Sequence, residues 1–376
     1  MPSLLTTVPA VRHPVRNVVH PIVDRVSVVR VDDRPVFVGA CPRSGTTLLR
    51  SMLNAHPDLA LPRETHFVME AYRNRQKFGD LRNPVNQRKL ARWLVHRDRT
   101  QFNRLEIPPE QAMRALRAAP PTLGSIIGTG FKLYADHNAK RRWGDKRPMY
   151  IQFLPELFAL FPDAQVVIIV RDPRAVVASM KKLEWPRAVI RDGTVEGGTR
   201  RWLKAVAAGR LALRRYRRDQ VLQIRYEDLV VDPTGVLSHV CSFLDLNDSG
   251  LKAMLEYHVE GSDIPTPQRA RYHPKVAKPV TDEAVRSWAE VLTGDEIATI
   301  ERLAGREMAR YGYQLQQIAP PAHATSGRLS ANVVEQAKAL VRPGAPSDDD
   351  IHPVAARLTT AQQRRHAMLR RLRLDG

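Results

Sequence analysis

The chain has 376 residues, 43% of them hydrophobic, and five Trp, which is enough to bury a sizeable core and excludes a disordered chain. Its formal net charge is +20, from 59 Lys and Arg against 39 Asp and Glu. This excess favours a polyanionic partner, such as a phosphorylated cofactor, an acidic acceptor or nucleic acid, but an ordinary basic surface would show it too.

The first 34 residues form a poorly periodic arm without the continuous apolar segment of a secretory signal. No stretch of the chain approaches the roughly 20 apolar residues that a membrane-spanning helix needs. The two cysteines, Cys41 and Cys241, make no metal-ligand pattern and fit a reducing compartment. We therefore expect a cytoplasmic protein without a transmembrane segment.

Apolar runs alternate with amphipathic segments along the rest of the chain. Short, β-branched runs predict buried strands at 35–40, 166–170 and 221–224. Helical spacing predicts helices at 47–55, 151–161, 174–182, 198–217, 233–244 and 295–310, with a basic, mostly helical region at 64–119. This alternation predicts an α/β fold with a parallel β-sheet flanked by helices.

Composition also divides the chain. We expect an N-terminal arm at 1–34, a catalytic domain at 35–318 and a basic tail at 319–376, with an amphipathic helix near 360–372. The tail is rich in Pro, Ala and Ser before it becomes basic. An arginine-rich tail can contact an anionic membrane surface, although a solvated charged tail is the simpler interpretation.

The segment GACPRSGTTLL, residues 39–49, is the strongest local signal. It leads from a predicted strand through a small-residue loop directly into a helix, and backbone amides at such a helix start bind anions. Gly45 permits close backbone approach, Ser44, Thr46 and Thr47 supply hydroxyls, and Arg43 supplies a forked cation. The pattern predicts a phosphate-binding loop.

The loop departs from the nucleoside-triphosphate P-loop, G-x-x-x-x-G-K-[ST]. Ala40 replaces the first Gly, and Thr46 stands where the Lys is required. Since that Lys serves the β- and γ-phosphates, its absence opposes a kinase-like phosphotransferase that uses ATP.

A second anion site is predicted where the strand at 166–170 ends. Arg171 lies at the carboxyl end of that strand, where parallel sheets bind ligands, and Ser179 lies two helical turns into the next helix. The two side chains can grip a phosphate between them. The alternative is a surface ion pair between Arg171 and Asp172.

The run Pro42 to Thr47 resembles the phosphosulfate-binding loop of the sulfotransferases that use 3′-phosphoadenosine 5′-phosphosulfate (PAPS). Its Arg form, continuing into SMLNAHP, is most similar to the protein-tyrosine and bacterial small-molecule branch. The resemblance covers about residues 35 to 313. It implies the P-loop-like sulfotransferase fold with helical insertions, PAPS as donor, adenosine 3′,5′-bisphosphate (PAP) as product, and no required metal.

The resemblance also implies roles for single residues. Arg171 and Ser179 fall where the family binds the 3′-phosphate, and Tyr226, in RYEDL, falls where a Tyr lies beside the nucleotide. Lys278, before Pro279 and Trp288, resembles the late lysine that closes over the cofactor. Lys146, in WGDKRP, resembles the lysine that precedes the second phosphate strand.

Sulfuryl transfer needs a base for the acceptor hydroxyl and cations for the developing charge. Arg43 and Lys146 are the catalytic cations that we expect. Glu64, 21 residues after Arg43 in a Glu-Thr context, falls where the tyrosine branch has its base. His66 and His56 are the alternative bases.

The acceptor is not legible in the sequence. A phenolic or tyrosyl metabolite, a peptide, a carbohydrate or a glycolipid all fit. A basic nucleic-acid-binding protein without enzymatic activity is a further alternative. The aromatic content of 6%, not interleaved with the basic residues, opposes it, and we expect no specific nucleic acid as partner.

Overall fold

The structure, a computed structural model, describes residues 34–183, 193–258 and 283–316. Residues 1–33 of the predicted arm, the predicted tail at 319–376 and Lys278 lie outside the described residues. The division into arm, domain and tail therefore stays a prediction.

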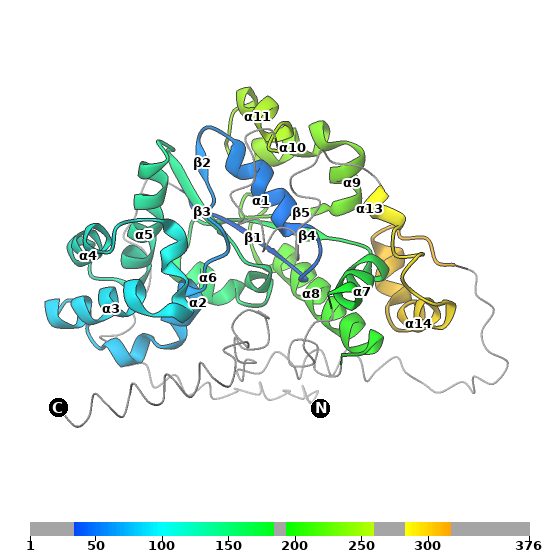
Figure 1. The fold of residues 1–376 in the computed structure, drawn as a ribbon, viewed down its shortest axis with the longest axis horizontal. Coiled ribbons are helices and arrows are strands. Elements are labelled where there is room, and N and C mark those ends of the chain that lie inside the picture. The colour runs from blue at the N-terminus through cyan, green and yellow to red at the C-terminus, as the bar shows by residue number, and fades with distance from the viewer. Residues whose placement is uncertain (1–33, 184–192, 259–282, 317–376) are drawn as a thin grey trace, which may run out of the picture.

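Within the described residues, five parallel strands form one sheet in the order β2-β3-β1-β4-β5 (Figure 1). Their bounds are β1 (Val36–Ala40), β2 (Leu59–Ala60), β3 (Arg142–Lys146), β4 (Gln165–Val170) and β5 (Val221–Arg225). Because neighbouring strands of the sheet are parallel, the connection after each strand returns the chain to the edge where the strands begin. This confirms the predicted α/β class.

Helices cover both faces of the sheet. The α-helices are α1 (Thr46–Ala55), α2 (Phe67–Arg73), α3 (Pro84–His96), α4 (Pro109–Ala118), α5 (Leu123–His137), α6 (Leu154–Leu160), α7 (Pro173–Lys182), α8 (Val195–Arg215), α9 (Tyr226–Val231), α10 (Pro233–Phe243), α11 (Leu251–Leu255), α13 (Glu283–Arg286) and α14 (Gly294–Arg310). Short 3-10 helices are η1 (Arg75–Phe78), η2 (Asp98–Thr100), η3 (Phe102–Leu105), η4 (Pro148–Gln152) and η5 (Asp248–Gly250).

Alternation along the central strands builds two cores. Val36 and Val38 of β1 belong to the core shared with α1, α10 and α11, whereas Phe37 belongs to the core shared with α5, α6 and α8. Figure 1 shows α1, α10 and α11 on one side of the sheet and α6 and α8 on the other. Residues buried on both faces explain why β4, QVVIIV, is apolar almost throughout.

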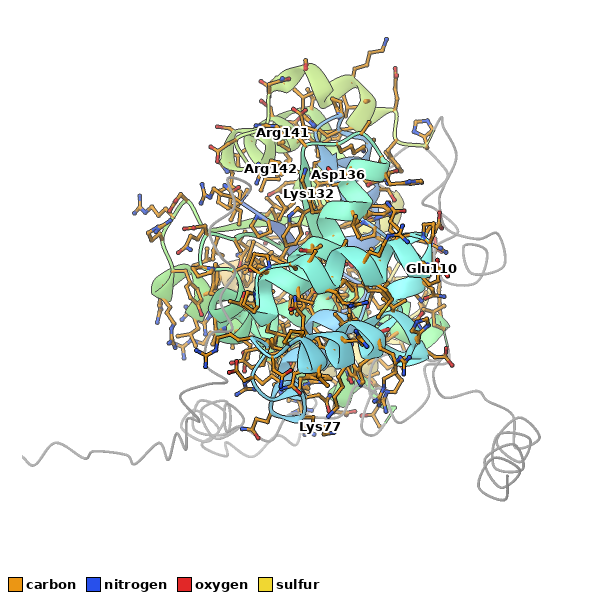
Figure 2. All side chains as sticks on the ribbon, turned by 90° about the vertical axis from the view of Figure 1, so that its left-hand side faces the viewer. Lys77, Glu110, Lys132, Asp136, Arg141 and Arg142 are labelled. Carbon is orange, nitrogen blue, oxygen red and sulfur yellow. The ribbon has the colours of Figure 1, made fainter. Side chains whose placement is uncertain are left out.

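The basic, helical region predicted at 64–119 is indeed helical, and it packs at the β2–β3 end of the sheet. Helices α2 to α5 lie together on that side (Figure 1), and Figure 2 looks onto them, with Glu110 on α4 and Lys132 and Asp136 on α5. The Lys132 Nζ and an Asp136 carboxylate oxygen lie 2.8 Å apart, one helical turn from each other.

The helix expected at 151–161 is wrong in its first turn. Residues Pro148–Gln152 form η4 instead, and α6 begins only at Leu154. Pro155 has no amide hydrogen to continue a helix from residue 151, but it suits the first turn of a new one. The sequence also gave no signal for β2, β3 or α5.

Candidate active site

Four neighbouring strands end at one edge of the sheet, and a residue that the sequence singled out lies at or just after the end of each. Lys146 ends β3, the anion loop follows β1, Arg171 follows β4, and Tyr226 follows β5. The register pairs Ala40 with Ile169 and Val170 with Arg225, so β1, β4 and β5 end within one residue of one another. It pairs Val38 with Lys146, so β3 ends two residues earlier. This is the edge where parallel sheets bind ligands.

The loop after β1 has the conformation that an anion site needs. Gly45 has φ +93°, in the left-handed region, and precedes the first residue of α1, Thr46. A Cβ on Gly45 would overlap the Tyr226 ring, so only Gly fits both the backbone and the space. No side chain caps this helix start, which leaves its amide groups for a ligand.

Four of the predicted residues meet at this loop. The Arg43 Nε donates to the Ser179 Oγ at 3.0 Å, and Arg171 donates to the Arg43 carbonyl oxygen at 3.2 Å. The Arg171 guanidinium lies 4.2 Å from the centre of the Tyr226 ring. The two anion sites expected from the sequence are therefore adjacent.

These cations lie close together in a partly buried place. Burial first, and the charge of Arg171 second, together lower the pKa of Arg43 to about 10. Both effects disfavour the positive charge, so a bound anion would relieve them. Ser44, which is fully buried, has an Oγ atom with no hydrogen-bond partner among the described residues.

Hydrogen bonds to the backbone fix the end of β4, and they come from residues that the sequence did not single out as ligands. The Trp202 Nε1 of α8 donates to the Arg171 carbonyl oxygen at 2.8 Å. The Asp172 amide donates to Glu227 at 2.9 Å, and Glu227 accepts a second bond, 3.0 Å, from the Tyr313 hydroxyl. Through Glu227, the segment after α14 is thus connected to the backbone next to Arg171.

Asp172 is not the ion-pair partner of Arg171 that we had considered. Its carboxylate lies 2.6 Å from the Arg174 guanidinium and caps α7 through the Arg174 amide. Arg174 also contacts Glu301 of α14 at 2.8 Å. These contacts direct Asp172 into the α7–α14 packing.

A second group of polar residues surrounds the predicted base. The Lys146 Nζ donates to the Glu64 Oε2 at 2.8 Å, and both side chains are largely buried. Arg104 donates to the backbone carbonyl of Glu64. A carboxylate and an ammonium group thus stand together beside the strand edge, although they are far apart in the sequence.

Asp145, next to Lys146, is fully buried and was not predicted. Its Oδ2 accepts bonds from the Thr65 hydroxyl at 2.8 Å and the Tyr150 hydroxyl at 2.5 Å. Burial raises the pKa of Asp145 to about 6, although both hydrogen bonds oppose the rise. The sequence offered no pattern that marks this acid, because β3 was not predicted as a strand.

The two histidines differ. His56 is buried, its Nδ1 accepts from the Asp58 amide at 3.0 Å, and its Nε2 lies 3.0 Å from the Asn247 carbonyl oxygen. Both ring nitrogens are used, so His56 joins η5 to the end of α1 and is not available as a base. His66 precedes α2, and its amide donates to the Thr100 carbonyl at 3.0 Å.

Comparison with known proteins decides the family. A model described as "Sulfotransferase family" matches residues 35–250. The chain belongs to the sulfotransferase family. This confirms the resemblance drawn from the loop and the prediction of a sulfotransferase.

Curated relatives of this sulfotransferase include two from animals. It is 25% identical over 273 residues to a protein-tyrosine sulfotransferase of Drosophila melanogaster, covering 72% of the chain and 50% of that relative. It is 25% identical over 309 residues to protein-tyrosine sulfotransferase A of Caenorhabditis elegans, covering 80% of the chain and 72% of that relative. The chain thus spans only half of the fly protein.

Among solved structures, the sulfotransferase domain from the curacin biosynthetic pathway matches with a TM-score of 0.53 and 22% identity. The match covers 77% of the chain and all of that domain. It confirms the predicted fold of this sulfotransferase. In the part of the chain that the structure describes, no helix is long and apolar enough to cross a membrane.

Changing Gly45 to Ala should destabilise this sulfotransferase. Ala is strained in the left-handed backbone conformation, and its Cβ overlaps the Tyr226 ring. The two effects together should lower the free energy of unfolding by about 1–3 kcal/mol. Urea unfolding followed by circular dichroism measures it. Gly294→Ala is the control, because nothing lies within 4 Å of the Cβ it would add. Equal midpoints for wild type and Gly45→Ala would contradict the loop conformation.

Proposed function

We propose that this protein transfers a sulfuryl group from PAPS to a hydroxyl group of an acceptor. One observation carries the proposal: two cationic sites, at the ends of β1 and β4, adjoin through the Arg43–Ser179 hydrogen bond. A nucleotide with phosphates on both the 3′ and 5′ positions of one ribose suits two adjoining sites, and an ordinary nucleoside triphosphate does not need the second. Membership of the sulfotransferase family supports the same donor.

The donor sites are assigned as follows. Amides at the start of α1, with the hydroxyls of Ser44, Thr46 and Thr47, bind the 5′-phosphosulfate end, and Arg43 supplies its charge. Arg171 and Ser179 bind the 3′-phosphate. Tyr226, which lies against both Gly45 and Arg171, forms the wall beside the nucleotide. Lys278, outside the described residues, stays a prediction from the family resemblance.

PAPS supplies an activated sulfuryl group on a phosphate leaving group. Glu64 takes the proton of the acceptor hydroxyl as the acceptor oxygen bonds to sulfur and the bond from sulfur to the phosphate oxygen breaks. Lys146 orients the Glu64 carboxylate through their 2.8 Å contact and places a cation beside the transferred group. The proposed roles need no metal. Within the described residues, no cluster of three His, Cys, Asp or Glu side chains could hold one.

The acceptor class follows only from the relatives. Both animal relatives are named as protein-tyrosine sulfotransferases, which makes a tyrosyl or other phenolic hydroxyl the first acceptor to test. A carbohydrate or glycolipid hydroxyl is the second, because Glu64 can accept a proton from either.

Ligand-dependent thermal stability tests the donor. PAP should raise the melting temperature of the protein, because a ligand that binds the folded state stabilises it, whereas ATP with Mg²⁺ should raise it much less. Transfer from ³⁵S-labelled PAPS to 4-nitrophenol, a tyrosine-containing acidic peptide and chitotetraose then tests the reaction. Stabilisation by ATP and Mg²⁺ but not by PAP would favour a kinase-like phosphotransferase. A steeply salt-dependent shift with DNA or RNA alone would favour nucleic-acid binding.

Substituting Glu64 by Gln should reduce kcat by roughly 10²-fold or more, because the amide cannot accept the hydroxyl proton. The dissociation constant of PAP should change little, since Glu64 lies outside the proposed donor sites. Glu110→Gln, on the exposed surface of α4 (Figure 2), is the matched control. Unchanged turnover in Glu64→Gln would transfer the role of base to His66.

Substituting Arg171 by Ala should weaken PAP binding by about tenfold or more, because the proposed charge-assisted bonds to the 3′-phosphate are lost. Isothermal titration calorimetry with PAP and with adenosine 5′-monophosphate separates the two phosphates: the monophosphate, which lacks the 3′ group, should lose much less affinity. Arg141→Ala, on the exposed surface (Figure 2), controls for overall charge. Wild-type affinity for PAP in Arg171→Ala would show that the second anion site is misplaced.

A further inference from the structure

Two pairs of consecutive residues, one of which includes the proposed base, form a closed ring of hydrogen bonds. Glu64 and Thr65 come from the segment before α2, and Asp145 and Lys146 come from the end of β3. The Lys146 Nζ donates to Glu64 at 2.8 Å, and the Thr65 hydroxyl donates to Asp145 at 2.8 Å. Each pair therefore contributes one side chain to the proposed chemistry, Glu64 or Lys146. The other two side chains form a tether, the hydrogen bond from Thr65 to Asp145.

The tether is buried and the chemical pair is nearer to solvent. Asp145 and Thr65 are fully buried, whereas the Glu64 side chain keeps 14% of its surface exposed. A third element joins the tether, because the Tyr150 hydroxyl of η4 donates to the same Asp145 oxygen at 2.5 Å. One oxygen of Asp145 in β3 thus holds both η4, five residues on, and the segment before α2, 80 residues away.

We propose that Asp145 is a positioning residue for sulfuryl transfer, whose carboxylate holds Thr65 and thereby sets the place of Glu64 against Lys146. The inference rests on the proposed function, since it assigns Glu64 as base. Arg104 supports the same arrangement by donating to the Glu64 backbone carbonyl. With its carbonyl and the following residue both held, Glu64 can reach Lys146 without losing many side-chain conformations, which keeps the base preorganised.

Besides accepting the hydrogen bond of the tether, Asp145 carries a charge that acts on the ionisable groups around it. The charged or titratable groups that interact with it are Glu64, Lys146, Arg104 and Tyr150. Its other oxygen, Oδ1, is buried and accepts no hydrogen bond within the described residues. Burial raises the pKa of Asp145 to about 6, so the carboxylate is ionised at neutral pH and protonated below about pH 5.

Thr65 variants test the tether. Thr65→Val removes the hydroxyl while it keeps the shape, and Thr65→Ser keeps the hydroxyl. We expect Thr65→Val to lower kcat about tenfold or more at every pH from 5 to 8.5, with the PAP dissociation constant unchanged, and Thr65→Ser to restore most of the rate. The readout is ³⁵S transfer from PAPS to the best of the three acceptor probes, or PAPS hydrolysis where none accepts.

Asp145→Asn tests the charge, because its amide oxygen can still accept both hydrogen bonds. Wild type and variant should have similar kcat/KM near pH 5, where Asp145 is itself neutral, and should diverge to about tenfold by pH 7.5. Asp136→Asn, an exposed aspartate of α5 (Figure 2), is the matched control and should follow wild type at every pH. A purely structural role for Asp145 would lower the rate equally at all pH values.

The pH dependence of stability gives a readout that needs no activity. Because the folded pKa of Asp145 lies above its ordinary value of 3.8, its protonated form favours folding. That contribution is complete below about pH 4 and is lost as pH rises through about 6. The unfolding free energy of wild type relative to Asp145→Asn should therefore fall between pH 4 and 7.

The outcomes separate the two proposals. If the wild-type protein neither transfers label nor releases PAP from PAPS, the proposed function fails, and the stability comparison still reports whether Asp145 ionises near pH 6. If wild type is active but Thr65→Val and Asp145→Asn match it in kcat and in pH profile, the positioning role is wrong. Rescue by Thr65→Ser together with the pH-dependent loss in Asp145→Asn supports it.

Discussion

The proposed site depends on the parallel pairing of four strands. β3, β1, β4 and β5 run side by side in one direction, so the residues that follow them meet at one edge. This pairing brings Arg43, Arg171 and Tyr226 together from three connections, and it places Lys146 at the same edge, at the end of β3. A shift of one strand by one residue would turn the side chains of that strand to the opposite face and displace the residues that follow it.

The same edge concentrates positive charge that the surrounding helices fix in place. Trp202 and Glu227 hold the backbone at the end of β4, and burial and the charge of Arg171 lower the pKa of Arg43. Such an arrangement costs stability in the absence of an anion and preorganises the site for one. Away from these cations along the edge, the Glu64–Lys146 pair supplies opposite charges, as a proton acceptor beside a cation requires.

Local pattern explains what the sequence predicted. The anion loop, β4 and the start of α7 can each be recognised because their meaning lies in a few consecutive residues, such as the Gly45 turn or the Pro173 helix start. Arg171 was also predictable, as the first polar residue after a buried strand.

Long-range contacts explain what it did not predict. β3, with the sequence RWGDK, carries three charged residues in five, and only its burial between β1 and β2 makes it a strand. The tether from Asp145 to Thr65 joins residues 80 positions apart, and Tyr313 reaches Glu227 across 86. No spacing rule along the chain reveals such pairs.

The measurement that most directly tests the site is a crystal structure with PAP bound. We expect its 5′-phosphate on the amides at the start of α1 and its 3′-phosphate between Arg171 and Ser179. Density for PAP elsewhere, with the loop and Arg171 not in contact with it, would contradict the site.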